Sequence, residues 1–588
     1  MKKTDTQELF CVGKSERRKD TLSKACGEAL YTDDYSYGGM LYARAVRSPR
    51  PHIKINRISA GKAAQVKGFV ALVTSEDVPG KNQWSLVIND YPYLPDSEAR
   101  FAGETVALVV AETPEAALKA ASLVELDYSE LPYAGDPIEA MAQDSVKVYG
   151  ENNVFSSFVI KRGDADRAFK EADVVVERDF KTNYQVHVYL ETQAMIAFPE
   201  ANNAITVYGS MQCPFYILDG VAEVLGIPHS RVRVVQRTTG GGFGGKEEVP
   251  VIVAAHAALC AWKTGRPVKL VYDRIEDFQS MSKRHPSRTK IAYAARRDGR
   301  ITAARVEYIL DAGAYSTMSP VVLWRGTVHA AGPYHIENVD IKSFAVATNK
   351  VPCGAYRGFG QPQVAFANES LIDELAEKLG MDPIELRLKN ILKTGDKTVT
   401  GQTIELSGLD DVIETVRKKS GWDKKRKQAP KSGAKKYGVG MSVNYYGVGL
   451  GARGQYLERA GANVIINKDG SVRVAVGNVE MGQGALTVLC QICAETLNVP
   501  FDSVDMTEVD TSRVPDSGPT VASRTTLMSG NAIIEACTPL RERIFSVARE
   551  LLITGGAPSK EMLASRGEFA IDGHKIRFAE VVAECWRR

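Results

Sequence analysis

The chain has 588 residues, of which 44% are apolar and 25% are charged, and its formal net charge is +3. A chain of this length exceeds a single hydrophobic core, so we expect about two to four domains with the composition of an ordinary soluble protein. The balanced charge supplies no basic face for nucleic acid, and no apolar run is long enough to span a bilayer, so neither partner is expected.

The N-terminus and the cysteines favour a cytoplasmic location. The first twenty residues contain two lysines near the start but no apolar stretch behind them, which excludes a signal peptide. The nine cysteines are scattered along the chain, as expected in a reducing compartment. The one close pair, Cys490 and Cys493, lies among apolar residues at helical spacing, so two buried helix cysteines are favoured over a metal site.

Segment 15–135 is predicted to be a small α+β unit. The continuous apolar run "GETVALVVA" (Gly103–Ala111) predicts a buried strand. Thr113 and Pro114 are the residue types preferred at a helix N-cap and at the first helical position, so a helix should begin there. A further strand is expected in "VELDYSELP" (Val124–Pro132), and a polar stretch near 136–155 leads onward.

Strands and helices are predicted to alternate from about residue 156 to 395. "RVRVVQR" (Arg231–Arg237) alternates with a period of two, which indicates a strand. "ESLIDELAEKLG" has one apolar helical face and ends at Gly380, a residue suited to the C-terminal cap. The next helix should restart with Asp382 as its cap and Pro383 as its first residue.

The basic run Arg417–Lys436 contains Gly, Pro and Ser between structured units, so a solvated linker is favoured over a nucleic-acid tail. The third region is predicted to begin with strands in "KYGVGMSVNYYG" (Lys436–Gly447). A hairpin should follow in "GANVIINKDGSVRVAVG", with its turn at "KDG".

The stretch "TTGGGFGGKEE" (Thr238–Glu248) satisfies two phosphate-loop patterns at once, G-x-G-x-x-G and G-x-x-x-x-G-K. Glu247 and Glu248 would compete with a pyrophosphate for the backbone N–H groups, which weakens the dinucleotide interpretation. Glu247 also stands where a nucleotide-binding P-loop requires Ser or Thr. A packing turn is the remaining plain alternative. The favoured interpretation is a glycine bend that brings backbone close to a ligand.

Other stretches have a similar construction, with amide or guanidinium groups set among glycine or proline. They are "MQCPFY" with Gln212, "CGAYRGFGQPQ" with Arg357 and Phe359, and "GNVEMGQGA" with Gln483. The stretch "DSGPTVASRTTLMSGNA" crowds small and hydroxyl residues before a helix. Together they favour a large, flat, polar ligand held by backbone and neutral side chains. We expect these loops to converge in one buried cleft between the two later regions.

Taken in order, "QCP", "TTGGGFGGKE", "KRHP", "AYRGFGQPQ", "EMGQG" and "PTVASRTT" resemble the molybdenum-binding subunit of the xanthine dehydrogenase/aldehyde oxidase family. The likeness covers nearly the whole chain. It implies a mixed α/β chain with a hammerhead domain at 1–135 and a first molybdopterin-binding domain at 136–400. A helix and basic linker at 401–436 and a second, incomplete molybdopterin-binding domain at 437–588 should follow.

The resemblance also implies a molybdopterin cofactor, which in bacteria often carries a cytosine dinucleotide, with a molybdenum centre that hydroxylates carbon using oxygen from water. It places Gln212 on an oxo ligand of molybdenum, and the backbone of Phe243 and Gly244 against the metal. The pterin itself holds the molybdenum, so no direct protein ligand is expected. The implied cofactor contacts are Gln212, Phe243, Gly244, Arg357, Gly482, Gln483, Thr520, Ala522 and Ser523.

Three residues are the candidates for substrate binding. Glu247 and Arg325 occupy the positions that hold a Glu and an Arg in the purine-oxidising members, and Phe359 offers a ring for stacking. The resemblance therefore implies oxidation of a xanthine-like purine, with an aldehyde or a nicotinate-like heterocycle as the alternative. Gly358, where the carbon monoxide dehydrogenase branch has a cysteine, argues against that branch.

Partner subunits are implied because this chain has no C-x₄-C-x₂-C run and no flavin loop. They would be a 2Fe–2S subunit and an FAD-binding subunit. Family members use a glutamate near the C-terminus as general base, but the last Gly–Glu pair here, Gly567–Glu568, precedes a hairpin-like turn rather than a proline. The base is therefore expected outside this polypeptide, in a separate C-terminal molybdopterin subunit or in a segment lost by truncation.

Two interpretations from other classes stay open on the sequence alone. One is an NAD-dependent dehydrogenase that uses the G-x-G-x-x-G loop, and the other is a non-catalytic cofactor-binding module.

Overall fold

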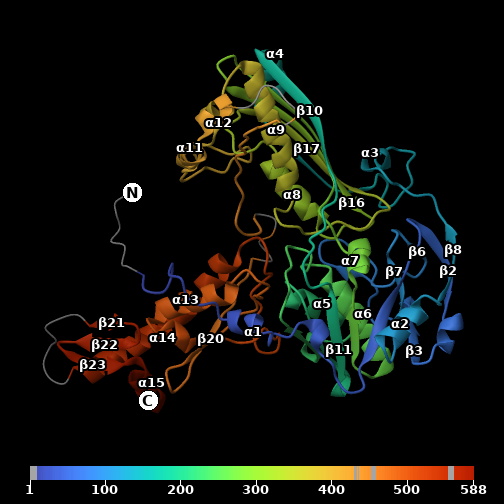
Figure 1. Cartoon of the computed structure of the whole chain (residues 1–588), viewed down its shortest axis with the longest axis vertical. Helices are drawn as coiled ribbons and strands as arrows, with labels where there is room; N and C mark the ends of the chain where they lie inside the picture. The colour runs from blue at the N-terminus through green and yellow to red at the C-terminus, as the bar shows by residue number, and fades with distance from the viewer. Residues whose placement is uncertain (1–8, 429–433, 435, 452–453, 455–457, 554–561) are drawn as a thin grey trace.

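The computed structural model describes residues 9–428, 434, 436–451, 454, 458–553 and 562–588. Its largest sheet lies in the lower right of Figure 1. The strand order is β13 (Val232–Gln236), β12 (Ala204–Gly209), β11 (Ala194–Glu200), β14 (Val268–Val271), β1 (Leu41–Arg47), β7 (Thr105–Ala111) and β3 (Phe69–Val73). Helices α5 (Pro214–Leu225) and α6 (Pro250–Thr264) pack together and against this sheet.

The predicted N-terminal α+β unit shares this sheet with the region that follows. β1 pairs with β14 in parallel, with Leu41 opposite Val268, so the sheet crosses the expected boundary at residue 135. All residues of β7 are buried, in agreement with the apolar run. Helix α2 (Pro114–Ala121) begins as predicted, because the Thr113 side chain accepts a hydrogen bond from the Ala116 N–H. A smaller sheet joins β6 (Glu98–Ala99), β2 (Ile53–Ser59) and β8 (Glu125–Glu130).

A second large sheet occupies the top of Figure 1. Its strands, in order, are β10 (Val174–Thr182), β15 (Ser287–Ala295), β16 (Ile301–Gly313), β17 (Asn338–Ala347) and β9 (Val154–Arg162). Helices α8 (Ser319–His329) and α9 (Gln361–Leu379) pack against it. α9 ends at Gly380, whose φ of 67° gives the left-handed cap that the sequence predicts. Helix α10 (Pro383–Asn390) follows with Asp382 as its cap.

The described part of the basic run, as far as Gln428, is helical and not an extended linker. Helices α11 (Leu409–Ser420) and α12 (Trp422–Gln428) extend to Gln428, and the predicted linker beyond it lies partly outside the described residues. Trp422 is buried in the core that α9 also lines, and its indole N–H donates to the Asp382 carboxylate. Burial of this ring explains why the segment folds despite its charge.

The third region, at the lower left of Figure 1, packs helices α13 (Ala485–Leu497) and α14 (Thr525–Leu552) against small sheets. The sheets are β18 (Asn463–Ile466), β19 (Val472–Ala475) and β20 (Val504–Met506), and then β21 (Leu563–Ser565), β22 (Glu568–Ile571) and β23 (His574–Arg577), with α15 (Phe578–Arg587) last. The β18–β19 hairpin is antiparallel, as its "KDG" turn predicts. Cys490 and Cys493 are buried in α13, also as predicted.

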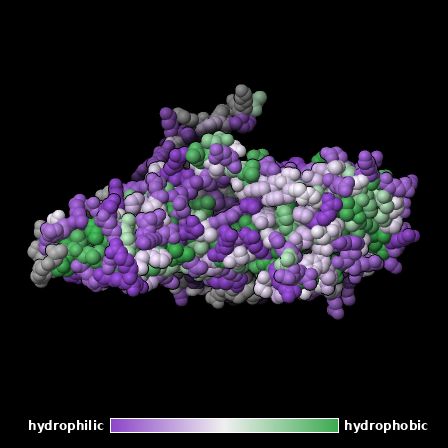
Figure 2. Space-filling view, turned by 90° about the horizontal axis from the view of Figure 1, so that it is seen from below, coloured by the Kyte–Doolittle hydropathy of each residue, from purple (hydrophilic) through white to green (hydrophobic). Residues whose placement is uncertain are grey.

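The third region meets the first large sheet at its β13 edge. The Val234 carbonyl accepts the Thr511 N–H, and Arg233 of β13 forms an ion pair with the buried Asp510 at 2.7 Å. The face seen in Figure 2 is mainly polar, with apolar residues gathered at both ends of the view. Among the described residues, no helix combines the length and the apolar character needed to traverse a bilayer.

Candidate functional site

A cavity of about 670 Å³ lies where the glycine loops of the later regions meet. All the residues that the sequence selects for cofactor or substrate contact line it. They are Gln212, Phe243, Gly244, Glu247, Arg325, Arg357, Phe359, Gly482, Gln483, Thr520, Ala522 and Ser523. Residues more than three hundred positions apart are thus brought to one place, since the Gln212 amide donates to the Thr520 carbonyl at 3.3 Å.

The loop between β13 and α6 forms one wall of the cavity. The Gln212 Oε1 atom accepts the Gly244 N–H at 2.9 Å and the Lys246 N–H at 3.3 Å, so this side chain fastens the loop. α6 begins only at Pro250, after both glutamates, so the glycines do not lead directly into a helix N-terminus. Both phosphate-loop interpretations are therefore wrong for this loop, because they require loop amides at the start of a helix.

Four residues that line the cavity have strained backbone conformations. Phe243, Phe359, Ala522 and Ser523 have left-handed φ values of 56°, 45°, 52° and 54°. Residues with a Cβ atom avoid this region, and each such residue costs about 1–3 kcal/mol, which surrounding contacts must offset. Such strain is typical of ligand-binding loops, where it fixes the direction of backbone groups.

Two adjacent residues of this loop, Glu247 and Glu248, have buried carboxyl groups. The Glu248 carboxylate accepts the Ala355 N–H at 3.0 Å, and burial raises its pKa to about 7. Glu247 is 4% exposed and lines the cavity, and no donor among the described residues reaches its carboxyl group. Burial, with a smaller contribution from Glu248, holds the pKa of Glu247 well above its ordinary value. Burial therefore favours the protonated form of Glu247, whose carboxyl group lines the cavity.

Arg325 projects from α8 into the same cavity. Its guanidinium donates to the Gly449 carbonyl and lies 5.1 Å from the centre of the Tyr446 ring. The Gly449 N–H in turn donates to the Ala522 carbonyl at 3.0 Å. The segment Tyr446–Leu450, which we call the cavity strap, thus connects Arg325 of α8 to the loop of the third region that carries Ala522.

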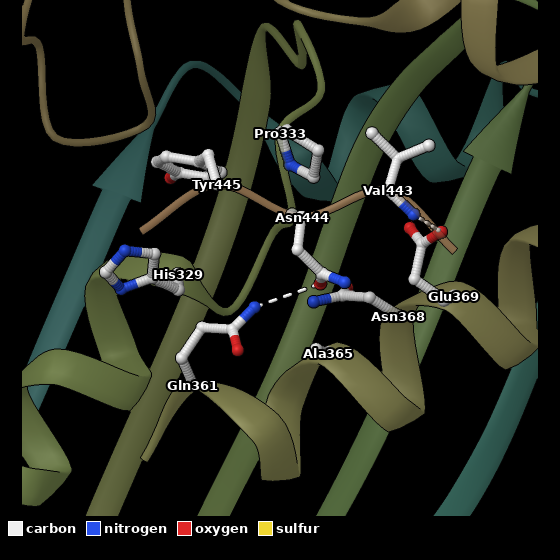
Figure 3. A pocket seen from close by; sticks show the side chains of 10 residues that line it. His329, Pro333, Gln361, Ala365, Asn368, Glu369, Val443, Asn444 and Tyr445 are labelled. Atoms are coloured by element: carbon white, nitrogen blue, oxygen red, sulfur yellow. Dashed lines mark hydrogen bonds between the residues drawn. The ribbon is translucent and has the colours of Figure 1, made fainter. Parts of the chain in front are cut away.

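Residues Lys436–Gly447 form no strand, so the strand prediction for "KYGVGMSVNYYG" is wrong. The segment lies over α9 instead (Figure 3). The Val443 N–H donates to the Glu369 carboxylate at 2.7 Å, and Gln361 donates to Asn444 at 2.9 Å. The alternating apolar residues Val439, Met441 and Val443 pack against the core that α9 lines, and the strap follows directly in the chain.

A buried arginine organises the loop that carries Thr520, Ala522 and Ser523. Arg524 is fully buried and donates to the Ser517 and Pro519 carbonyls at 3.0 and 3.1 Å. It also pairs with the Glu458 carboxylate at 3.0 Å, and Glu458 accepts the N–H of Leu450 in the strap. Arg524 stands within the "PTVASRTT" motif, but its role in holding this loop was not predicted from the sequence.

The Gln483 side chain serves its own loop. Its amide accepts the Met481 N–H and donates to the Val479 carbonyl, both at 2.8 Å. The guanidinium of Arg357, by contrast, has no partner among the described residues and lines the cavity. Glu568 does not line it and instead pairs with Lys575 at 2.8 Å.

These groups fit a flat, anionic cofactor. The free Arg357 guanidinium can pair with phosphate oxygens. Gly482 and Gly484 have φ values of 116° and 89°, and a Cβ atom on either would meet nothing within 4 Å, so the backbone there faces open space. Among the described residues, no group of three or more His, Cys, Asp or Glu side chains is arranged to hold a metal.

Comparison with known proteins identifies that cofactor. The aldehyde oxidase and xanthine dehydrogenase a/b hammerhead domain matches residues 26–132, and molybdopterin cofactor-binding domains match residues 147–391 and 415–588. The xanthine dehydrogenase molybdenum-binding subunit of Escherichia coli O157:H7 is 33% identical over 91% of this chain and 72% of its own length. The nicotinate dehydrogenase large molybdopterin subunit of Eubacterium barkeri is 38% identical over 71% of this chain and 98% of its own length.

Solved structures of other enzymes have a similar fold. The aldehyde oxidoreductase of Desulfovibrio gigas superposes with a TM-score of 0.83 at 30% identity, over 90% of this chain and 59% of that one. Quinoline 2-oxidoreductase of Pseudomonas putida 86 superposes with a TM-score of 0.85 at 25% identity, over 98% of this chain and 76% of that one.

Fold and cavity thus define a molybdopterin-binding large subunit of a molybdenum hydroxylase. The chain belongs to the xanthine dehydrogenase/aldehyde oxidase family, as the ordered motifs indicate. The expected fold class is confirmed, with a hammerhead domain followed by two molybdopterin-binding domains.

Proposed function

We propose that this chain oxidises a xanthine-like purine, or a similar nitrogen heterocycle, by hydroxylating a ring carbon with oxygen from water. The observation that carries the proposal is the presence of Arg325 and Glu247 in the cavity that also holds the Gln212 and Phe243 glycine loops. The molybdenum cofactor, when bound, supplies the two-electron oxidation. The protein side chains bind and orient the substrate.

Arg325 provides a fixed positive charge. Oxidation of an electron-poor ring carbon develops negative charge on the substrate, and a guanidinium in a partly buried site stabilises that charge. The strap carbonyl and the Tyr446 ring hold the guanidinium in place, so little reorganisation is needed as charge develops.

Glu247 complements this charge at a second point on the ring. Burial favours the protonated form of its carboxyl group, which can donate one hydrogen bond and accept another, and this suits a ring that bears both N and N–H groups. The Phe359 ring lines the cavity and offers an apolar face for stacking. Together these groups select a flat heterocycle over a simple aldehyde, which lacks the ring atoms that they would bind.

A nicotinate-like acid is the second candidate substrate. It is favoured by the 38% identity to the Eubacterium barkeri nicotinate dehydrogenase subunit. Arg325 could pair with the carboxylate of such a substrate. We propose that Gln212, Phe243, Gly244, Arg357, Gly482, Gln483, Thr520, Ala522 and Ser523 contact the cofactor, and that it carries a cytosine dinucleotide.

We further propose three partners, namely a 2Fe–2S subunit, an FAD-binding subunit and a second molybdopterin subunit that supplies the general base. In support of the last, Glu247 is the sole carboxyl group among the described residues that line the cavity. Helix α14 follows the loop that carries Thr520, Ala522 and Ser523, which we call the cofactor loop. On this helix Leu527 and Ile534 are 53% and 41% exposed and lie two turns apart on one face. A partner that covers this face would stand beside the cavity.

The test is an assay of the assembled complex with xanthine, nicotinate and a simple aldehyde. Arg325→Met should lower kcat/KM on the heterocycles by about 2–4 kcal/mol of lost charge stabilisation and affect the aldehyde far less. Glu568→Ala should leave turnover unchanged. An equal loss on heterocycle and aldehyde after Arg325→Met would show that the assigned role is wrong, and loss of turnover in Glu568→Ala would identify Glu568 as the missing base.

A further inference from the structure

The segment Phe10–Asp20, which we call the N-terminal clamp, lies along α13 of the third region, although the two are far apart in the sequence. The Glu495 carboxylate accepts the N–H groups of Phe10, Cys11 and Val12 at 3.3, 2.8 and 3.0 Å. One turn earlier on α13, the Gln491 amide donates to the Cys11 carbonyl at 2.8 Å.

A further turn toward the start of α13, the Thr487 hydroxyl accepts the Lys19 N–H at 3.1 Å. Thr487, Gln491 and Glu495 stand four positions apart, so they form one stripe along the helix. The clamp therefore runs along α13 toward its N-terminus, where the loop Met481–Gly484 lines the cavity.

Arg18 is the clamp residue that reaches this loop. Its Nη1 atom donates to the Gly482 carbonyl at 3.1 Å, and its Nη2 atom lies 3.5 Å from the Glu480 carboxylate. Asp20 holds the guanidinium from behind with two hydrogen bonds of 3.0 Å. This planar, two-point support fixes the direction of the guanidinium better than a single contact could.

The hydrogen bond from Arg18 to the Gly482 carbonyl sets the orientation of the Gly482–Gln483 peptide group. In a trans peptide the carbonyl and the following N–H point in opposite directions, so holding the Gly482 carbonyl toward Arg18 turns the Gln483 N–H away from it. Gly482 has a φ of 116° and would not resist rotation by itself. Both residues line the cavity, whereas Arg18 does not.

The Gln483 N–H is distinct within its loop. Glu480 accepts the N–H groups of Gly482 and Gly484 at 2.7 and 3.0 Å, and the Gln483 side chain accepts that of Met481. Among the described residues, the Gln483 N–H has no acceptor. A backbone donor left open at the cavity wall, beside the start of a helix of 13 residues, is suited to an anionic oxygen.

We propose that Arg18 is a positioning residue for cofactor binding, which holds the Gly482–Gln483 peptide so that the Gln483 N–H is presented to the cofactor. The inference rests on the proposed assignment of Gly482 and Gln483 to the cofactor. It makes the N-terminal clamp, which precedes the residues 26–132 matched by the hammerhead model, a functional part of the second molybdopterin-binding domain.

The experiment compares Arg18→Ala with Arg17→Ala in the purified complex. Arg17 is the matched control, because it is the exposed neighbour in the same segment and has no partner among the described residues. Molybdenum and pterin are measured per chain after timed gel filtration, and hydrogen exchange of residues 479–486 is followed by mass spectrometry. Thermal unfolding is recorded for each variant.

Arg18→Ala should release the cofactor roughly 10-fold faster, as loss of a charged hydrogen bond implies, and speed exchange in 479–486, while Arg17→Ala matches the wild type. Arg18→Lys should restore retention in part, since an ammonium reaches the carbonyl without the fork. Unchanged cofactor retention in Arg18→Ala would overturn the proposal. So would a lower unfolding temperature with equally faster exchange throughout the third region, because that result indicates general destabilisation.

The proposed substrate class and the proposed role of Arg18 can be refuted independently of each other. If the wild-type complex retains molybdopterin but Gln483→Pro, which lacks the N–H, retains it equally, the role of Arg18 is refuted while the proposed chemistry stands. If the wild-type complex retains the cofactor and responds to Arg18→Ala but oxidises no heterocycle, the proposed substrate class fails and the positioning role stands.

Discussion

Replacement of Arg524 by Met should unfold the cofactor loop locally while leaving the rest of the third region in place. Methionine keeps the apolar stem of the side chain but removes the guanidinium. The Ser517 and Pro519 carbonyls would then lose donors at 3.0 and 3.1 Å, and the Arg459 carbonyl one at 2.6 Å. The Glu458 carboxylate would lose its ion pair as well.

The magnitude follows from burial. Removing one partner of a buried ion pair costs about 3–5 kcal/mol, because the remaining groups stay desolvated. The Arg524 side chain is fully buried, but that of Glu458 is 18% exposed and can recover some hydration. We therefore expect a loss near the lower bound, about 3 kcal/mol, which corresponds to about two orders of magnitude in an opening equilibrium.

Hydrogen exchange measures this opening directly. Amides of residues 517–526 should exchange about 100-fold faster in Arg524→Met than in the wild-type complex. Arg543→Met is the control, since Arg543 is an exposed residue of α14, the helix that follows this loop. Exchange within threefold of the wild type, roughly 0.7 kcal/mol, would refute the view that Arg524 holds this loop.

Two further predictions concern the glycine loop. Burial raises the pKa of Glu247 in the folded chain. The contribution of this side chain to the free energy of unfolding is therefore greatest below about pH 4.5, where it is protonated in both the folded and the unfolded chain. That contribution falls by about 1.4 kcal/mol per pH unit as the pH rises toward the folded-state pKa. Glu247→Gln should therefore raise the unfolding temperature of the cofactor-free chain at pH 8 and not at pH 4, and a pH-independent difference would contradict this. Gly244→Ala places a Cβ atom 2.8 Å from the Ala355 carbonyl group at a φ of 103°, whereas Gly395→Ala has a similar φ of 92° and open space. Gly244→Ala should be less stable than Gly395→Ala by about 1–3 kcal/mol in thermal unfolding, and equal losses would show that the contact is relieved by relaxation.

Local structure could be predicted from the sequence where neighbouring residues decide it. The cap at Thr113, the left-handed end at Gly380 and the restart at Asp382 each depend on one side chain and the backbone beside it. The same holds for the "KDG" hairpin. The ordered motifs also identified the family, because each loop keeps its glycines and polar residues in a short stretch.

Predictions failed where a distant contact replaced a local preference. Residues Lys436–Gly447 alternate like a strand, but no strand lies beside them, and Glu369 of α9 accepts the Val443 N–H instead. The charges of α12 suggested a solvated linker, but Trp422 is buried in the core that α9 lines. Neither α9 nor its acceptor Glu369 could be located relative to these segments from periodicity alone.

For the site, the sequence by itself selected residues that line one cavity, and the tertiary structure decided how they are held. Gln212 and Arg325 each stand in a local motif, but their hydrogen bonds reach Thr520 and Gly449, which lie 308 and 124 positions away in the chain. Gly449 in turn donates to the Ala522 carbonyl. Arg18 touches Gly482 across 464 positions, and no local pattern encodes that pairing. A glycine loop limits the conformations of its own backbone, whereas the partner that fixes one of them depends on packing between regions, which exists only in the folded chain.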